Sequence, residues 1–281
     1  MPETPDFDLR PTGDTPPERP PRPARSPAAW ILAVALILAA AAAAYVFLRG
    51  RQPAQDATAG QPAAERGSAA APATPLGGEA TPIDVPPLNE SDPLVRELVS
   101  ALSSHPRIAA WLATDNLIRK FVVVVENIAY GTNPAPQVAA LRPTATFRVL
   151  DRDGELSIDP RSYERYAGIA DAAASVDTQG AADLYATLKP RIEEAWAELG
   201  RAGSFDQALE RAIVVLLRTP VVEGDVPLTL GPVGYRFADP ALERLSPAQK
   251  QLLRMGPRNQ RVIQEKLRAT ALELGVPSEN L

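Results

Sequence analysis

Basic residues are concentrated near the C-terminus, in a pattern suited to binding an anion. Seven basic residues and one acidic residue lie within positions 244–268. Three of the basic residues have the spacing i, i+4, i+7: Arg254, Arg258 and Arg261. This spacing places side chains on one face of a helix, unless Pro257 interrupts it. With Asn259 beside them, the arginines predict a surface that docks an anionic ligand or an acidic partner. A solvated helix face with no ligand is the alternative.

A second candidate surface combines aromatic and basic residues. Tyr163 and Tyr166 are interspersed with Arg161 and Arg165. Tyrosine rings and guanidinium groups together predict a binding patch. Ordinary solvated surface is again the alternative.

Glu126 is the candidate for acid–base chemistry. It lies near the end of an apolar run, and the spacing of four puts Tyr130 on the same helical face. A carboxyl group beside an apolar stripe can act as a general acid or base. A hydrogen-bonded structural carboxylate is the alternative interpretation.

Composition excludes several other chemistries. The 281 residues contain no cysteine and a single histidine, His105, so thiolate catalysis, cysteine-ligated metals and paired-histidine zinc sites are excluded. The pattern Asp151-x-Asp153-Gly154 resembles the start of a calcium loop, but the sixth and twelfth positions hold Leu156 and Ser162, which indicates a tight turn. Nucleotide and serine-nucleophile motifs are absent from the sequence. We expect no metal, no cofactor and, with a net charge of −5, no nucleic-acid partner.

The elements that must position these residues are mainly helices. Ser91 or Asp92 before Pro93 predicts a helix that ends at His105-Pro106, and Asp115 is expected to cap a second helix that ends at Gly131. Later helices are expected over 159–169, 178–199, 204–217, from 246 and from 257, with Pro190 as a kink or break in the second of these. A β-hairpin is expected over 147–158, and short β segments over 226–230 and 235–237. The fold class is therefore mainly α, with a small β-hairpin and short β additions.

The first third of the chain has a different composition. Sixteen of the 30 prolines precede residue 88. Residues 28–48 contain no charge and would span about 31 Å as a helix, which matches the hydrocarbon core of a bilayer. We interpret 28–48 as one transmembrane helix, 1–27 as a disordered cytoplasmic tail, 49–90 as a linker rich in proline and alanine, and 91–281 as a helical periplasmic domain. A cleaved signal peptide or a buried soluble helix are the alternatives for the apolar segment.

Orientation rests on a small charge difference. Arg19, Arg22 and Arg25 precede the apolar segment, and Arg49 and Arg51 follow it. An excess of basic residues marks the cytoplasmic side, so we expect the N-terminus inside and the large domain in the periplasm.

Four stretches resemble a known family: SDPLVRELVSALSSHP, WLATDNLIRKFVVVVENIAYG, FADPALERLSPAQKQLLRMGPRN and IQEKLR. They resemble the uncharacterised bacterial membrane proteins of domain-of-unknown-function family 3014 (DUF3014) over roughly residues 90–275. The resemblance implies a single-pass protein of the inner membrane of a Gram-negative bacterium. It implies no activity and no site residue.

The sequence therefore predicts a membrane-anchored binding or assembly module of the bacterial envelope. Its partners are expected to be the lipid bilayer, through 28–48, and an envelope protein or an anionic envelope ligand. An envelope hydrolase that uses carboxylate chemistry, with Glu126 as the acid, is the alternative function.

Overall fold

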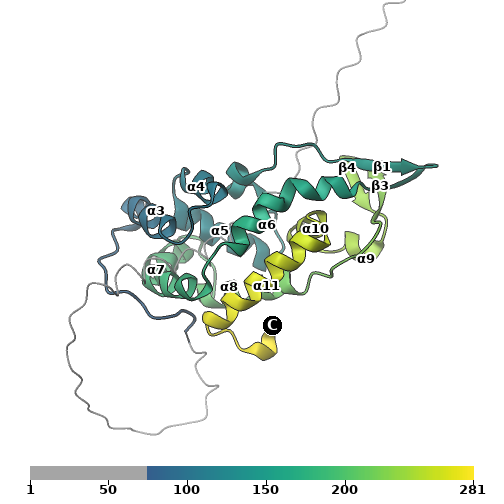
Figure 1. The fold of residues 1–281 in the computed structure, drawn as a ribbon. Coiled ribbons are helices and arrows are strands. Elements are labelled where there is room, and N and C mark those ends of the chain that lie inside the picture. Colours follow the sequence, from purple (N-terminus) through teal and green to yellow (C-terminus); the bar gives the residue numbers. More distant parts are fainter. Residues whose placement is uncertain (1–74) are drawn as a thin grey trace, which may run out of the picture.

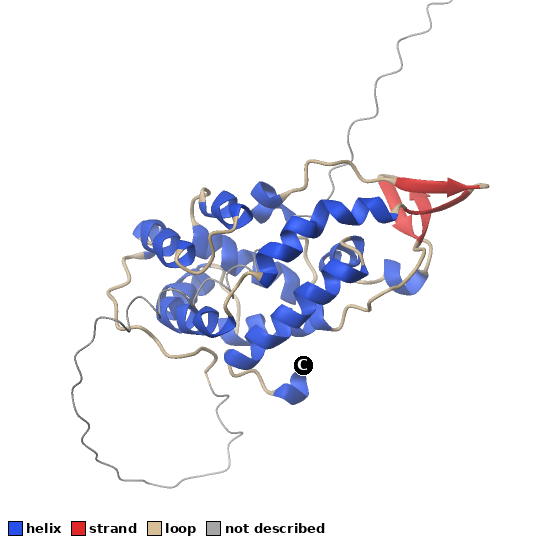
Figure 2. Cartoon of the chain, in the orientation of Figure 1, coloured by secondary structure: helices blue, strands red, loops and turns tan. Residues whose placement is uncertain are grey.

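The computed structural model describes residues 75–281. Helices dominate this part of the chain, and one small sheet lies at one end of it (Figures 1 and 2). The α-helices are α3 (Asp92–Ser100), α4 (Pro106–Leu112), α5 (Leu117–Ala129), α6 (Ala167–Ala174), α7 (Thr178–Glu198), α8 (Phe205–Leu217), α9 (Pro240–Glu243), α10 (Pro247–Arg254) and α11 (Pro257–Glu273). Short 3₁₀ helices are η1 (Leu88–Glu90), η2 (Ala135–Leu141), η3 (Pro160–Tyr166) and η4 (Ser278–Asn280). The mainly helical class is confirmed.

The predicted tail 1–27 and transmembrane segment 28–48 lie outside the described residues, as does most of the predicted linker. Within residues 75–281, no helix combines the length and the apolar character needed to cross a membrane.

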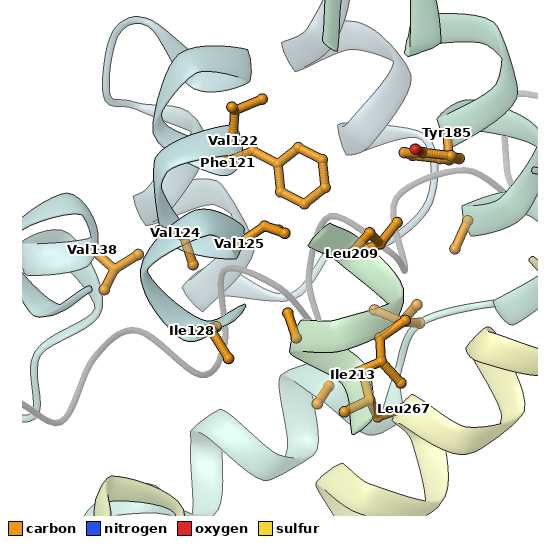
Figure 3. Packing of buried hydrophobic residues seen from close by; sticks show 14 of the residues in the cluster. Phe121, Val122, Val124, Val125, Ile128, Val138, Tyr185, Leu209, Ile213 and Leu267 are labelled. Carbon is orange, nitrogen blue, oxygen red and sulfur yellow. The ribbon is translucent and has the colours of Figure 1, made fainter. Parts of the chain in front are cut away.

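The main core is built around α5. Its Val122, Val124 and Val125 are completely buried, because α7, α8 and η2 surround the helix. Figure 3 shows Phe121 of α5 facing Leu209 of α8 and the ring of Tyr185 on α7. A run of β-branched residues also suits a strand, but here burial on every side stabilises the helix that the sequence predicts.

Most predicted helix starts are confirmed by their caps. His105, which the sequence places at the end of the first helix, instead begins a separate helix, α4, because its Nδ1 accepts a hydrogen bond from the backbone N–H of Arg107. The first helix ends earlier, at Ser100. Ser246 and Gln249 form a capping box at the start of α10.

The expected cap of α5 by Asp115 is wrong. The carboxylate that accepts from the first backbone N–H groups of this helix belongs to Asp92 on α3, at 2.7 Å from Asn116 N and 2.9 Å from Leu117 N. Asp115 instead pairs with Arg96. The carboxylate at the start of α5 therefore comes from Asp92, 25 positions before Leu117, and not from the neighbouring Asp115 that the local sequence indicates.

Pro190 neither breaks α7 nor ends it. Proline inside a helix costs about 3 kcal/mol because a backbone hydrogen bond is lost. The buried face of α7, which includes Leu188 and Ile192, packs in the main core and outweighs this cost.

Residues 76–90, which the sequence places in the linker, lie against α7 and form a strap on the body. Gly78 N–H donates to Ala182 O, and Glu79 N–H donates to Asp183 Oδ1 at 2.8 Å. A Cβ on Gly78 would lie 2.1 Å from Asp183 Oδ1, so only glycine permits this approach. Leu76 and Leu88, near the two ends of the strap, are buried in the main core.

A cluster of three side chains on α7 and α8 fixes the start of the strap. Lys189 Nζ donates to Asp206 Oδ2 at 2.6 Å and to Leu76 O at 3.0 Å. Asp206 also accepts from the backbone N–H of Leu76 and from the Tyr185 hydroxyl. Burial, followed by the nearby carboxylate, raises the pKa of Tyr185, so this hydroxyl stays a donor. The strap is therefore bonded at its backbone and does not rest on apolar contact alone.

The predicted β elements join into one antiparallel sheet. It contains β1 (Val149–Arg152), β2 (Glu155–Ile158), β3 (Pro227–Gly231) and β4 (Gly234–Phe237), in that order. The two hairpins meet where Leu156 pairs with Leu228. One face covers a small second core that contains Ile158, Leu228, Phe237 and Leu253, the last of which comes from α10. The sheet is thereby attached to the helical body at α10.

Candidate functional site

The three arginines with helical spacing do not share a helix face. Pro257 begins α11, and Gly256 before it has φ of 83°, so the chain turns between Arg254 and Arg258. Arg258 is exposed at the start of α11, and Arg261 pairs with Glu223. Arg254, at the end of α10, lies 5.0 Å from the centre of the Phe237 ring at the end of the sheet. Arg254 thus lies on a different helix from the other two arginines. It also packs on an aromatic ring, whereas Arg258 is exposed and Arg261 forms an ion pair.

Asn259 is a buried linking residue, with 6% of its surface exposed. Its Nδ2 donates at 2.9 Å both to Met255 O and to the backbone carbonyl of Tyr163. The first turn of α11 is therefore tied to η3.

The two predicted surfaces consequently meet at one place. The Tyr163 ring covers Gly256, where a Cβ would approach ring carbons within 2.4–2.7 Å. Tyr166 is fully buried, and its hydroxyl accepts from Arg165 Nη2 at 2.7 Å. Burial raises the pKa of both tyrosines, so both phenols are neutral at physiological pH.

Arg165 lies over two aromatic rings beside this contact. Its guanidinium carbon is 4.8 Å from the centre of the Tyr166 ring and 5.4 Å from that of Phe147. It also donates from Nε to Ser162 O and from Nη1 to Ala145 O. These contacts fix the planar group in one orientation. Arg161, by contrast, turns away to Asp159 and lowers the pKa of that carboxyl group.

Gln251 completes the cluster. Its side chain is fully buried on α10 and faces the Tyr166 hydroxyl. Within the described residues, neither its Nε2 nor its Oε1 makes a hydrogen bond of ordinary geometry. The sequence carried a signal for this residue, since it is a polar position inside the buried stripe of Ala248, Leu252 and Met255.

The electrostatics of the cluster centre on Arg254. Burial lowers the pKa of its guanidinium, while Glu243 and Tyr166 act in the opposite direction. A guanidinium nevertheless stays protonated in proteins. Glu243 is already engaged: it accepts from Lys250 Nζ at 3.0 Å and from the backbone N–H of Phe237 at 3.1 Å. The cluster therefore carries a half-buried positive charge, and Glu243, the carboxylate that acts on it, is hydrogen-bonded to Lys250 and to the backbone of Phe237.

Glu126 contacts a different set of residues from those of this cluster. It is buried at the end of α5, and Arg201 Nη2 donates to its Oε1. The guanidiniums of Arg201 and Arg211 both lie over the Tyr130 ring. Glu126 is thus paired with a cation in a structural network. Hydrolysis by two carboxyl groups would instead require a second carboxyl group as its partner.

In residues 75–281, no group of three metal-ligating side chains comes together. The Asp151–Gly154 segment is a tight turn, in which Asp151 Oδ1 accepts from the Gly154 N–H at 3.0 Å. The turn interpretation of this motif is confirmed.

Comparison with known proteins places the site within a family. No curated protein and no solved structure matches the chain. One family model, described as a protein of unknown function (DUF3014), matches residues 117–270, from the start of α5 to near the end of α11. This span is more than half of the chain, and it contains every residue of the cluster around Tyr166. The chain belongs to the DUF3014 family of proteins of unknown function.

Proposed function

We propose that this protein is a membrane-anchored binding or assembly module of the bacterial envelope, with the helical domain in the periplasm of an inner-membrane protein. The observation that carries the proposal is the convergence of two separate polar segments. Asn259 of α11 donates a hydrogen bond to the Tyr163 carbonyl of η3, and the charge of Arg254 at the end of α10 acts on Tyr166 of η3, at the junction of the helical body and the sheet.

A junction of this kind suits binding better than catalysis. Binding sites combine aromatic walls with a few fixed polar groups. Here the walls are rings such as Phe147 and Phe237, and the polar groups are the guanidiniums that lie over them. No carboxyl pair and no activated nucleophile accompanies them among the described residues. The hydrolase alternative therefore gains no support from Glu126, which pairs with Arg201.

The strap limits how far the helical domain can lie from the proposed transmembrane segment. If 28–48 spans the membrane, roughly 27 residues separate its end from Leu76. Fully extended, that length of chain reaches about 90 Å. The helical domain would then stay within about 90 Å of the membrane that residues 28–48 span.

Site-specific photo-crosslinking in intact cells tests the proposal. A photoreactive amino acid replaces Arg258, which is exposed beside the cluster, and in a matched control it replaces Glu97, which is exposed on α3 away from the sheet (Figure 1). We expect a discrete adduct from position 258 that disappears in the Arg254→Gln background, and none from position 97. Equal adducts from both positions, or an adduct that Arg254→Gln leaves unchanged, would overturn the proposal.

Protease treatment of spheroplasts tests the orientation. Protease added outside should remove the helical domain, because that domain is proposed to face the periplasm. Full protection of the domain until the inner membrane is lysed would place it on the cytoplasmic side.

A further inference from the structure

Tyr130 is an exposed tyrosine with two arginines over its ring. The guanidinium carbons of Arg201 and Arg211 lie 5.2 Å and 5.1 Å from the centre of that ring. Arg201 comes from the loop between α7 and α8, and Arg211 comes from α8 itself. Tyr130 nevertheless keeps 43% of its surface exposed. Two cations and one aromatic ring are therefore gathered at a place that a partner can reach.

The backbone holds Tyr130 in one position at the end of α5. Gly131, which follows it, has φ of 76°, and its N–H donates to Ile128 O at 3.3 Å. The N–H of Thr132 donates to Asn127 O at 2.7 Å. These two bonds form the Schellman motif that ends a helix and satisfies its last carbonyl groups. A tyrosine fixed in this way loses little conformational freedom when a partner binds.

The positive charge at Tyr130 exceeds the negative charge that the described part of the chain supplies there. Glu126 is buried and accepts from Arg201 Nη2, so it balances one of the two guanidiniums. Arg211 is exposed, and among the described residues no ion pair and no hydrogen-bond acceptor engages its guanidinium. Its neighbour in sequence, Glu210, accepts from Asn280 Nδ2 at 2.7 Å. Arg211 therefore has free donors beside an exposed aromatic ring.

These residue types suit a protein partner better than a lipid surface. Tyrosine and arginine are enriched among the residues that dominate the binding energy of protein interfaces. Leu199, two positions before Arg201, adds a further exposed apolar side chain to the same loop. Binding to an anionic bilayer, by contrast, is typical of clusters of about four to eight basic residues. Here there are two guanidiniums, and one of them is already paired.

We infer that Tyr130, Arg201 and Arg211 form a docking surface for an acidic segment of a partner protein. A carboxylate of that segment pairs with Arg211, because a guanidinium binds a carboxylate through parallel hydrogen bonds. An apolar or aromatic side chain of the segment packs on Tyr130. This surface is built by α5, α8 and the loop before α8, whereas the junction of the proposed function is built by η3, α10 and α11. The inference therefore goes beyond the proposed function and does not depend on it.

Peptide binding to the full-length protein in detergent tests the inference. The probe is the terminally blocked peptide Glu-Glu-Phe-Glu-Glu, and Gln-Gln-Phe-Gln-Gln is the matched control. Because the protein has a net charge of −5, bulk electrostatics disfavour the acidic peptide. We nevertheless expect calorimetry to show at least about fivefold tighter binding of the acidic peptide. Sodium chloride at about 1 M should remove this preference, because exposed charges are then screened within about 3 Å.

Three substitutions locate the binding. Arg211→Gln should weaken the affinity for the acidic peptide at least about threefold, a loss typical of an exposed charged contact. Tyr130→Ala should also weaken it, because the phenylalanine of the peptide loses its aromatic contact. Arg244→Gln changes an exposed arginine at the end of α9 and should leave the affinity unchanged. The urea midpoint of Arg211→Gln should stay the same, which separates a binding role from a structural one.

Several results would overturn the inference. One is an acidic peptide that fails to bind or binds no more tightly than its control. Another is an affinity that Arg211→Gln and Arg244→Gln change equally. A lower urea midpoint of Arg211→Gln with unchanged peptide affinity would assign Arg211 a structural role. Binding to phosphatidylglycerol vesicles that Arg211→Gln abolishes, with unchanged peptide affinity, would identify a lipid surface as the occupant instead.

Discussion

The side-chain amide of Asn259 donates a hydrogen bond to the carbonyl of Tyr163, and these two residues are 96 positions apart. The bond joins the first turn of α11 to η3 and holds Tyr163 over the turn at Gly256. Because Asn259 is buried and its Nδ2 donates to two backbone carbonyls of the protein, its role is to position the cluster. In the proposed function, we expect contact with a ligand to fall to the arginines.

This relationship predicts a structural penalty at Asn259. Asn259→Leu should lower the free energy of unfolding by about 1–3 kcal/mol, because it leaves the Tyr163 carbonyl without its donor. The midpoint of urea unfolding measures the effect. Arg258→Gln, its exposed neighbour, should change stability by less than about 0.5 kcal/mol. Equal effects of the two substitutions would show that Asn259 does not hold the junction.

The strap predicts a glycine requirement at position 78. Gly78→Ala should release residues 76–90 from α7, because the new Cβ would collide with Asp183. Limited proteolysis should then cut the strap faster, and the unfolding midpoint should fall. Gly168→Ala on α6 is the matched control, since its Cβ has room and alanine favours a helix by about 0.5–1 kcal/mol. Unchanged cleavage in Gly78→Ala would mean that the strap is not held closely.

Glu243 predicts part of the acid sensitivity. Burial opposes its ionisation, but hydrogen bonds from Lys250 and the Phe237 N–H outweigh this effect and lower its pKa. A carboxyl group of this kind gives its full stabilisation above its unfolded-state pKa of about 4.3, and loses it as the pH falls through the lower folded-state pKa. Glu243→Gln should therefore show a smaller fall in urea midpoint between about pH 5 and about pH 3 than the unchanged protein. Glu97→Gln, exposed on α3, should keep the original pH dependence. A steeper pH dependence in Glu243→Gln would contradict this sign.

The ion pair of Glu126 and Arg201 predicts a coupling between two substitutions. Arg201→Ala should destabilise the protein by about 1–3 kcal/mol, because it leaves a buried carboxylate without its donor. Adding Glu126→Gln removes that charge and should recover part of the loss. Urea unfolding of the two single variants and the double variant gives the coupling energy. A coupling energy of zero would return Glu126 to consideration as an unpaired acid.

Local signals in the sequence predict the helix boundaries but not the site. Ser246 before Pro247 and Asp159 before Pro160 mark helix starts because capping depends on neighbouring residues. His105-Pro106, which the sequence indicates as a helix end, is also the start of α4. The capping of α5 by Asp92 depends on the packing of α3, so local sequence cannot reveal it. The same limit applies to the strap, whose backbone bonds to α7 leave no periodic pattern in the sequence.

For the candidate site too, the sequence indicates single residues but not the tertiary contacts between them. Tyrosine and arginine clusters mark Tyr163, Tyr166 and Arg254 as polar features of interest, yet the sequence presents them as two separate surfaces. Their union depends on the turn at Gly256 and on the pairing of β2 with β3, two segments about 70 positions apart. Folding separates Arg254 from Arg258 at this turn and places Arg254 against the Phe237 ring of the sheet.

Hydrogen–deuterium exchange of the full-length protein, in native membranes and after purification in detergent, tests the central claim most directly. If the junction is a binding site filled in the envelope, backbone amides of 160–166 and 251–261 should exchange more slowly in native membranes than in detergent, and both segments should lose this difference in Arg254→Gln. Amides of α3 should exchange at the same rate in both preparations. Protection confined to α3, or identical exchange of the two junction segments in both preparations, would contradict the account.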